Sequence, residues 1–207
     1  MRRTKEDADL TRQALLDAAL KVFGQEGYAA ARLEDVAETA GVTRGAIYHH
    51  FGSKSELFAS LVEDAAQSSR RAMAEAIAAG GGFPEIARRI LVISLRLLQE
   101  DARFRGAMAL LLFNSGDSPE LAGLRQLRIQ QGSEEMRQIA GFFEMGLAQG
   151  AVRPDLDPQI AARAFLAYQN GLILMALSAP ESIDIPAQAS GLADVFVRGI
   201  GSSHFLG

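Results

Sequence analysis

Apolar residues recur along most of the chain at the three- and four-residue spacing of amphipathic helices. The first such stretch places Leu15, Ala19, Val22 and Phe23 on one face and ends at Gly27. Glycine is common just beyond the last turn of a helix, because it adopts a left-handed backbone without strain. Alternating apolar and polar runs, which would predict strands, are almost absent. The pattern therefore predicts an all-α fold of about nine helices.

Polar residues between the apolar stretches predict where the helices begin. Ser53-Lys54-Ser55-Glu56 matches a capping box, in which a hydroxyl and a carboxylate satisfy two free backbone donors. The run Gly80-Gly81-Gly82 is the clearest break in the chain, and one apolar helix is predicted over about Phe104 to Phe113. Further helix starts are predicted at Pro84, Ser118, Asp157 and Asp184.

Two short helices in the first quarter of the chain are separated by a short turn that contains glycine. The first ends at Gly41, and the second begins after Thr43, a residue type suited to an N-cap. This is the helix-turn-helix pattern, in which the second helix is presented to the major groove of DNA. Ile47 and Phe51 are predicted to face the core.

The opposite face of the second helix carries residues suited to DNA. At 100° per residue, Gly45 and His49 lie opposite the buried side, Tyr48 lies on the flank and Arg44 projects from the amino-terminal tip. Arginine pairs with guanine O6 and N7, and Tyr and His suit phosphate and sugar contacts. Glycine in a first turn costs up to ~1 kcal/mol relative to alanine, which a close approach of the backbone to DNA would explain. Lys54, at the start of the next helix, is placed to bind a phosphate. Taken singly, each of these residue types is also common on an ordinary protein surface.

One ungapped segment of 45 residues carries a family signature, ALLDAALKVFGQEGYAAARLEDVAETAGVTRGAIYHHFGSKSELF. It resembles the DNA-binding head of the TetR (tetracycline-repressor) family of transcriptional regulators, and its combination of LEDVA, AGV, TRGAIYHHF and K-x-x-L-F is highly specific. The late segment FLAYQNGLILMAL and the chain length resemble the multidrug-efflux repressor branch, the acriflavine-resistance type. The resemblance implies DNA contacts by Arg44, Gly45, Tyr48 and His49, and phosphate contacts by Thr43 and Lys54.

The segment departs from the family pattern just before the first helix of the pair. Family members usually carry Thr-Ser or Thr-Thr there, which caps that helix and contacts phosphate, whereas this chain has Ala31-Arg32. Losing the cap costs about 1 kcal/mol. We expect Arg32 to contact phosphate through its charge instead.

Taken with the resemblance, the pattern predicts a helix-turn-helix DNA-binding domain over residues 1–55 and a ligand-binding and dimerisation domain over residues 56–207. In the second domain, the helix predicted at about Pro158 to Ser178 is apolar on two faces, so it needs cover on both sides. One face can pack within its own domain and the other against a partner subunit. The last helix also carries apolar residues that need to be covered in this way. The resemblance implies a two-fold dimer in which these last two helices form a four-helix bundle and two heads bind a palindromic operator.

The larger domain also offers candidates for a pocket that binds a small apolar effector. Large, adaptable side chains suit such a pocket, although each is also typical of an ordinary core. Charged residues that would demand an ionic ligand do not stand out. The candidates are Phe104, Met108, Leu112, Phe113, Met136, Phe143 and Met145, with Asn114, Gln169 and Asn170 as polar partners.

Charge restricts the area over which DNA can bind. The net charge is −4 and the pI about 5.4, which argues against a generic polyanion binder. Residues 1–58 carry 8 Lys/Arg and 9 Asp/Glu, yet residues 39–55 contain no acid. The nucleic-acid surface is therefore predicted to be a small local patch.

Composition argues against enzymes and membrane proteins. The chain has no cysteine, so disulfides, thiol catalysis and thiolate metal sites are excluded. The three histidines lack metal-ligand spacing, and the chain has no serine in a G-x-S-x-G turn, so we expect no enzymatic activity, cofactor or metal. The amino terminus lacks an apolar signal region, and the longest uncharged stretch, residues 164–180, is short for a membrane span. The expected location is the cytoplasm.

The favoured hypothesis is a repressor whose effector favours a conformer with the two DNA-binding heads mis-spaced. The alternative is an all-α dimeric interaction protein with a TetR-like head that no longer reads DNA. Two features favour this alternative, the pair Ala31-Arg32 and the acidic charge balance. Activation instead of repression stays open, and control of efflux genes follows from the resemblance alone.

Overall fold

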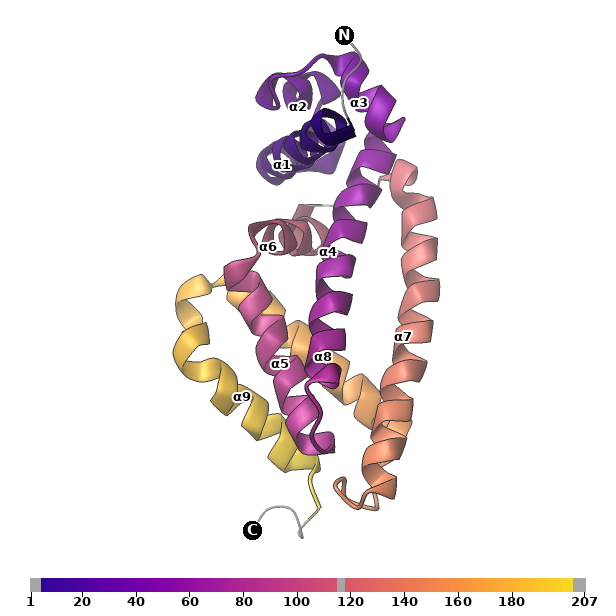
Figure 1. Ribbon diagram of the computed structural model, residues 1–207, viewed down its shortest axis with the longest axis vertical. Helices are drawn as coiled ribbons and strands as arrows, with labels where there is room; N and C mark the ends of the chain where they lie inside the picture. Colours follow the sequence, from indigo (N-terminus) through magenta and orange to yellow (C-terminus); the bar gives the residue numbers. More distant parts are fainter. Residues whose placement is uncertain (1–4, 115–117, 203–207) are drawn as a thin grey trace. The chain divides into compact units, whose positions relative to one another are not determined.

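A computed structural model describes residues 5–114 and 118–202, and the predicted all-α fold is confirmed there. These residues form nine α-helices, two 3₁₀ turns, one π-helical turn and a single isolated β-bridge, between Val152 and Gly201 (Figure 1). The α-helices are α1 (Lys5–Ala30), α2 (Leu33–Thr39), α3 (Arg44–Phe51), α4 (Lys54–Ala78), α5 (Phe83–Glu100), α6 (Ala102–Ala109), α7 (Ala122–Ala148), α8 (Pro158–Ser178) and α9 (Ile185–Ile200). The short turns are η1 (Leu110–Asn114, π-helical), η2 (Pro119–Leu121) and η3 (Pro180–Ser182).

Three of the predicted helix starts are confirmed by side-chain caps, whereas Ser118 makes no cap bond and begins only the 3₁₀ turn η2. Ser53, Asp157 and Asp184 each accept a hydrogen bond from the backbone N–H three residues later, at 3.1, 2.9 and 3.2 Å. The predicted end of the first helix is confirmed as well, because Gly27 has φ 77° and ψ 160° inside α1 and only a short turn follows it. Each of the three cap bonds satisfies a backbone N–H that would otherwise lack a partner at the start of a helix.

The helix predicted over Phe104 to Phe113 is interrupted. Helix α6 ends at Ala109, and the chain continues as the π-helical turn η1. Leu110 is buried, whereas Leu112 and Phe113 are exposed. The sequence from residue 107 to 113 is continuously apolar. Because it contains no polar positions to mark one face, the π-helical turn could not be predicted from it.

The chain divides into two compact units. The first contains the described residues up to Ser68 and those of 102–125, and the second contains 69–101 and 126–202. Helices α4 and α7 therefore each contribute to both units. The predicted boundary at residue 55 concerns a division of function, which packing alone does not test, and it stays a prediction.

The core of the first unit is built around three aromatic rings, Phe23, Tyr28 and Phe58, whose centroids lie 5.1–5.9 Å apart. Helices α1 to α4 surround this cluster with aliphatic side chains, and both η1 and η2 add a leucine. The main aliphatic members of this core are Leu15, Leu16, Val22, Leu33, Val36, Ile47, Leu57, Leu61, Leu110 and Leu121.

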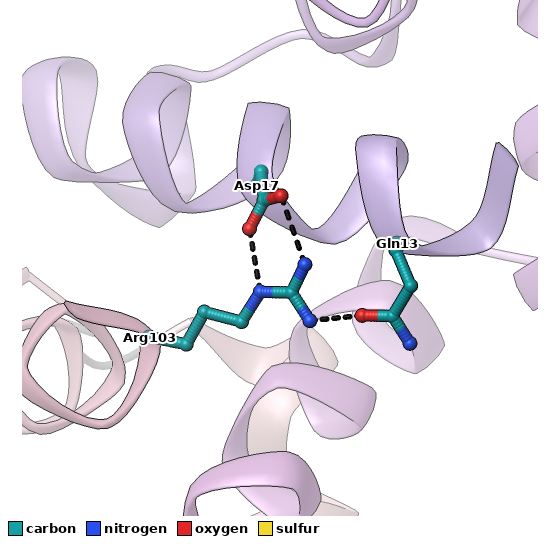
Figure 2. A network of polar contacts seen from close by, with 3 residues as sticks. All are labelled: Gln13, Asp17 and Arg103. Carbon is teal, nitrogen blue, oxygen red and sulfur yellow. Dashed lines mark hydrogen bonds and ion pairs between the residues drawn. The ribbon is translucent and has the colours of Figure 1, made fainter. Parts of the chain in front are cut away.

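Helix α6 is fixed to α1 by charge and by close packing. Arg103 donates from Nε and Nη2 to the two carboxylate oxygens of Asp17, at 2.6 and 2.8 Å, and from Nη1 to Gln13 (Figure 2). One turn later, a Cβ on Gly106 would lie 3.2 Å from the side chain of Leu20. The bidentate pair fixes the orientation of α6, because both guanidinium and carboxylate are planar.

In the second unit, α5 packs against α8 and α9 (Figure 1). Arg88 Nε pairs with Asp194 of α9 at 2.6 Å, and Tyr168 of α8 donates to the backbone carbonyl of Leu192 at 2.7 Å. Arg89 caps the end of α4, donating to the carbonyl of Gly80 at 3.1 Å and to that of Ala76. A cation at this end of a helix is favoured by the helix dipole.

Helices α8 and α9 leave large apolar side chains exposed. The exposed fractions are 58% for Ile160, 49% for Met175 and 43% for Leu174 in α8, and 66% for Val195 in α9. Within the described residues, α8 alone has a length and composition that would suit a membrane span, a test that core helices also pass. Its hydrogen bond to α9 shows that it belongs to the helical packing of this unit.

Gly146 and Gly141, both in α7, provide a matched test of the packing in the second unit. A Cβ on Gly146 would lie 2.5 Å from Phe83 and 2.8 Å from Val152, whereas a Cβ on Gly141 meets nothing within 4 Å. We expect Gly146→Ala to lower the free energy of unfolding by about 1–3 kcal/mol, and Gly141→Ala to raise it by up to about 1 kcal/mol. Urea denaturation measures both, and equal values for the two variants would contradict this packing.

Candidate nucleic-acid interface

The two helices of the predicted motif are present and are joined by residues 40–43. Gly41 has φ 67°, and the next N–H, that of Val42, bonds back to the carbonyl of Ala37 at 3.0 Å. A left-handed residue followed by such a bond ends α2 and redirects the chain. Ile47 and Phe51 of α3 are buried, as predicted, so the opposite face of α3 is turned outward.

The exposed face of α3 carries the four predicted contact residues, Arg44, Gly45, Tyr48 and His49. Arg44 Nη2 donates to Tyr48 Oη at 2.7 Å, and the Arg44 Cζ lies 5.3 Å from the centre of the Tyr48 ring. The hydrogen bond to Tyr48, followed by the charge of Glu34, raises the pKa of Arg44 above its ordinary value. The guanidinium is therefore held at the tip of the helix with its positive charge intact.

Glu34 is a neighbour that the sequence pattern did not indicate. Its carboxylate forms an ion pair with Arg44 Nη1, linking the first turns of α2 and α3. The two residues are ten positions apart, and only the turn between the helices brings them together. Both side chains are about half exposed, so the pair is open to exchange with another anion.

Gly45 lies in open space on this face. A Cβ at this position would meet only the hydroxyl of Thr43, at 3.8 Å. Packing within the protein therefore does not demand glycine here. The glycine leaves the backbone of α3 without a side chain at this exposed position.

The N-caps of the two helices differ in part from the predictions. Arg32 occupies the N-cap of α2 and makes no side-chain cap bond, so the predicted loss of that cap is confirmed. Thr43 occupies the N-cap of α3, as predicted, but its hydroxyl makes no cap bond either. Glu34 and Asp35 in the first turn of α2 offset the missing cap, because acids are favoured there by the helix dipole.

Lys54, the predicted phosphate contact, is held by the end of α1. Its Nζ donates to the carbonyl of Ala29 at 3.3 Å and lies 4.6 Å from the centre of the Tyr28 ring. Tyr28 in turn donates from Oη to Glu120 Oε2 at 2.8 Å. Burial, then the hydrogen bond to Glu120 and its charge, raise the pKa of Tyr28 well above its usual range. The sequence predicted only a helix start at Ser118, and it could not indicate this contact because 92 residues separate Glu120 from Tyr28.

The structure divides the predicted effector contacts between the two compact units. The first unit contains Phe104, which is buried, Met108, which is half-buried, Leu112 and Phe113, which are exposed, and Asn114, whose side chain lies outside the described part. The second contains Met136 and Gln169, both half-buried, Phe143, which is buried, and Asn170 and Met145, which are exposed.

A small pocket in the second unit lies between α4 and α5. Its volume of about 10 Å³ is room for about one water molecule. At its wall, Ser94 Oγ accepts a hydrogen bond from Gln169 Nε2 at 2.5 Å and donates to the carbonyl of Ile90 at 2.8 Å. The lining residues are Ser69, Ala72, Met73, Ile90, Ile93, Ser94 and Leu97. The apolar members from α5 follow the helical stripe that a core helix also shows, so periodicity could not identify them as a pocket.

Residues suited to metal binding do not cluster in the described ranges. Within 5–114 and 118–202, no group of three or more His, Asp or Glu side chains lies together. The arrangement at α2 and α3 instead combines an outward arginine, an exposed tyrosine and an open glycine. The chemistry of this surface suits an anion or a polar groove.

Two family descriptions match the chain. Residues 15–61 match "Bacterial regulatory proteins, tetR family", and residues 84–201 match "MAATS-type transcriptional repressor, C-terminal region". The first match contains α2, α3 and Lys54, and the second contains the pocket-lining part of α5 together with α8 and α9.

Similar proteins include regulators and solved repressors. The transcriptional regulator TtgR of Pseudomonas putida is 33% identical over 187 residues, which are 89% of this chain and 89% of TtgR. NalD, the secondary repressor of the MexAB-OprM multidrug efflux pump in Pseudomonas aeruginosa, has a crystal structure with a TM-score of 0.79 and 25% identity, covering 96% of this chain and 100% of NalD. SmeT of Stenotrophomonas maltophilia, solved with triclosan, has a TM-score of 0.77 and 26% identity, covering 95% and 94% of the two chains.

Gly45→Ala tests whether the fold itself needs this glycine. We expect the free energy of unfolding to rise by up to about 1 kcal/mol, because alanine favours helix and its Cβ would meet nothing closer than the Thr43 hydroxyl at 3.8 Å. Thermal or urea unfolding measures the change. A destabilised variant would show that the protein's own packing requires the glycine.

Proposed function

The chain belongs to the TetR family of DNA-binding transcriptional regulators, which are not enzymes. From this premise, we propose that it is a homodimeric repressor and that a small effector releases it from a palindromic operator. The observation that carries the proposal is the outward face of α3, where Arg44 is held by Tyr48 beside an open Gly45. This face has the size and chemistry to enter a major groove.

We assign separate roles to the residues of this face. Arg44 pairs with a guanine edge, and Tyr48 and His49 contact phosphate or sugar. Gly45 lets the backbone of α3 approach the DNA closely. Thr43 and Arg32, at the two N-caps, and Lys54, at the start of α4, contact phosphates. The hydroxyl of Thr43 supports this role, because it is not used as a cap.

The exposed apolar side chains of α8 and α9 support a homodimer built by these helices. Ile160, Met175 and Val195 each leave about half or more of their surface exposed, which is unfavourable in water. A second copy would cover the same patch on both chains around a two-fold axis. Two α3 helices related by that axis would read a palindromic operator.

We propose a neutral, mostly apolar effector that binds the larger domain. The pocket between α4 and α5 has no charged lining residue, and Gln169 reaches its wall through Ser94. Because this pocket has room for only about one water molecule, an effector would have to enlarge it. Of the predicted contacts, Gln169 bonds to the pocket-lining Ser94, and all of them, Gln169 included, are proposals. By linkage, an effector that binds the DNA-free conformer weakens operator binding to the same extent that operator weakens effector binding.

The relatives suggest which genes the protein controls. NalD is a repressor of a multidrug efflux pump, and SmeT was solved with triclosan. We propose that this chain represses efflux genes in the cytoplasm and that triclosan is a suitable first probe of its effector site. The competing hypothesis is a dimeric interaction protein whose TetR-like head no longer reads DNA. It rests on the missing cap at Arg32 and on the acidic charge balance.

Fluorescence anisotropy on the DNA that flanks the gene for this protein tests the proposal. Saturable binding that survives unlabelled non-specific competitor at two salt concentrations would establish a sequence-specific regulator. Weak binding that is indifferent to sequence and collapses with salt, on every probe from the surrounding genes, would favour the interaction protein.

Arg44→Ala and Lys54→Ala separate base reading from phosphate binding. Arg44→Ala is expected to lower operator affinity by about 5- to 150-fold and to relax specificity at one base pair. Lys54→Ala is expected to weaken operator and non-specific DNA alike and to make the dependence on salt shallower. Gly45→Ala serves as a third arm, because it should weaken operator binding while the fold stays intact. An Arg44 variant with full operator affinity would disprove its role in base reading.

Val195→Glu tests the proposed dimer surface. A carboxylate on the exposed face of α9 would be desolvated if a second subunit covered it, so we expect dissociation to monomers. Sedimentation equilibrium measures the mass, and Asp155→Lys, a charge change at an exposed residue between α7 and α8, serves as the control. A dimer of unchanged stability in the Val195 variant would place the interface elsewhere.

A further inference from the structure

Lys54 occupies a position that is unfavourable for a cation. It is the first residue of α4, where the helix dipole and the free backbone N–H groups both repel positive charge. The same features attract an anion, so the ammonium and the helix start together suit a phosphate. In the DNA-free protein, a flexible lysine at this point needs other groups to hold it in place.

Two contacts from the end of α1 supply that hold. The carbonyl of Ala29 accepts a hydrogen bond from Lys54 Nζ at 3.3 Å. The ring of Tyr28 presents its negative face, with its centroid 4.6 Å from the same nitrogen. These contacts order a side chain that otherwise loses much conformational freedom when it binds.

The Tyr28 ring is itself fixed on all sides. It is 1% exposed and packs edge-on to Phe58 at 5.1 Å and against Phe23 at 5.7 Å. Its hydroxyl donates to the carboxylate of Glu120 at 2.8 Å. A charged acceptor strengthens this bond and enriches the ring in electron density, which strengthens the attraction to Lys54.

We propose that Tyr28 and Glu120 are positioning residues for DNA binding: the Glu120 carboxylate fixes the Tyr28 hydroxyl, and the ring holds Lys54 in the geometry that binds phosphate. The inference rests on the proposed function, because it requires Lys54 to contact DNA. Neither Tyr28 nor Glu120 contacts DNA in this proposal. Since burial raises the pKa of Tyr28, the hydroxyl remains a donor at any physiological pH.

Salt dependence of operator binding tests this role. Each phosphate contact contributes about 0.9 to the slope of log K against log salt. Lys54→Met removes that contact and sets the reference slope. We expect Tyr28→Phe, which keeps the ring, to lower operator affinity by about threefold to tenfold and to shift the slope toward the Lys54→Met value. Glu120→Ala should lower the affinity and change the slope as Tyr28→Phe does. Glu120→Gln keeps a hydrogen-bond acceptor for Tyr28, so its slope should stay close to the wild-type value.

A double-variant cycle distinguishes positioning from mere stability. If Tyr28 acts through Lys54, Tyr28→Phe should cause no further loss in a Lys54→Met background. Glu26→Gln, at an exposed acid of α1, controls for the removal of one negative charge from the same unit. Thermal melts verify that each variant is folded at the temperature of the assay.

The outcomes separate this inference from the proposed function. Tyr28→Phe with an unchanged slope and a loss that adds in full to that of Lys54→Met would overturn the positioning role. An unaltered slope in Lys54→Met would also overturn it, because the lysine would then make no phosphate contact. A wild-type protein without saturable operator binding would instead refute the proposed function.

Discussion

The burial of Ile47 and Phe51 in the hydrophobic core of the first unit determines which face of α3 is available to a partner. Because these two side chains are buried, Arg44, Tyr48 and Gly45 face outward. The eight-residue helix is too short to be stable alone in water. The apolar contacts on one face therefore supply both its stability and the direction of its polar face.

Much of this region could be predicted from the sequence, because its determinants are local. The glycines at 27 and 41, the cap at Ser53 and the apolar spacing of α1 and α3 each act within a few residues. The resemblance to the TetR family then identified the outward residues of α3 as DNA contacts, a role that remains a proposal. Local patterns also placed the starts of α8 and α9, where aspartate caps are followed by proline.

Other features depend on the tertiary fold, and the sequence could not indicate them. Glu34 meets Arg44 only because the turn folds α2 back on α3, and Glu120 meets Tyr28 across 92 residues. The π-helical turn at η1 lies in a continuously apolar run, where the spacing of apolar residues cannot distinguish a π-helical turn from an α-helix. The pocket between α4 and α5 is lined by residues that also fit an ordinary core, so their pattern could not separate the two roles.

The continuity of α4 has a consequence for how the length of this protein can vary. The helix runs unbroken from Lys54 to Ala78 through the boundary between the compact units, with Ser53 capping its start and Arg89 capping its end. Inserting or deleting one residue within it would turn the side chains that follow in the helix by about 100° about the helix axis, so the apolar residues among them would leave the face that is buried. Single-residue changes in length should therefore be far more harmful in α4 than in the glycine run at 80–82, where chain length can change without altering the register of any helix.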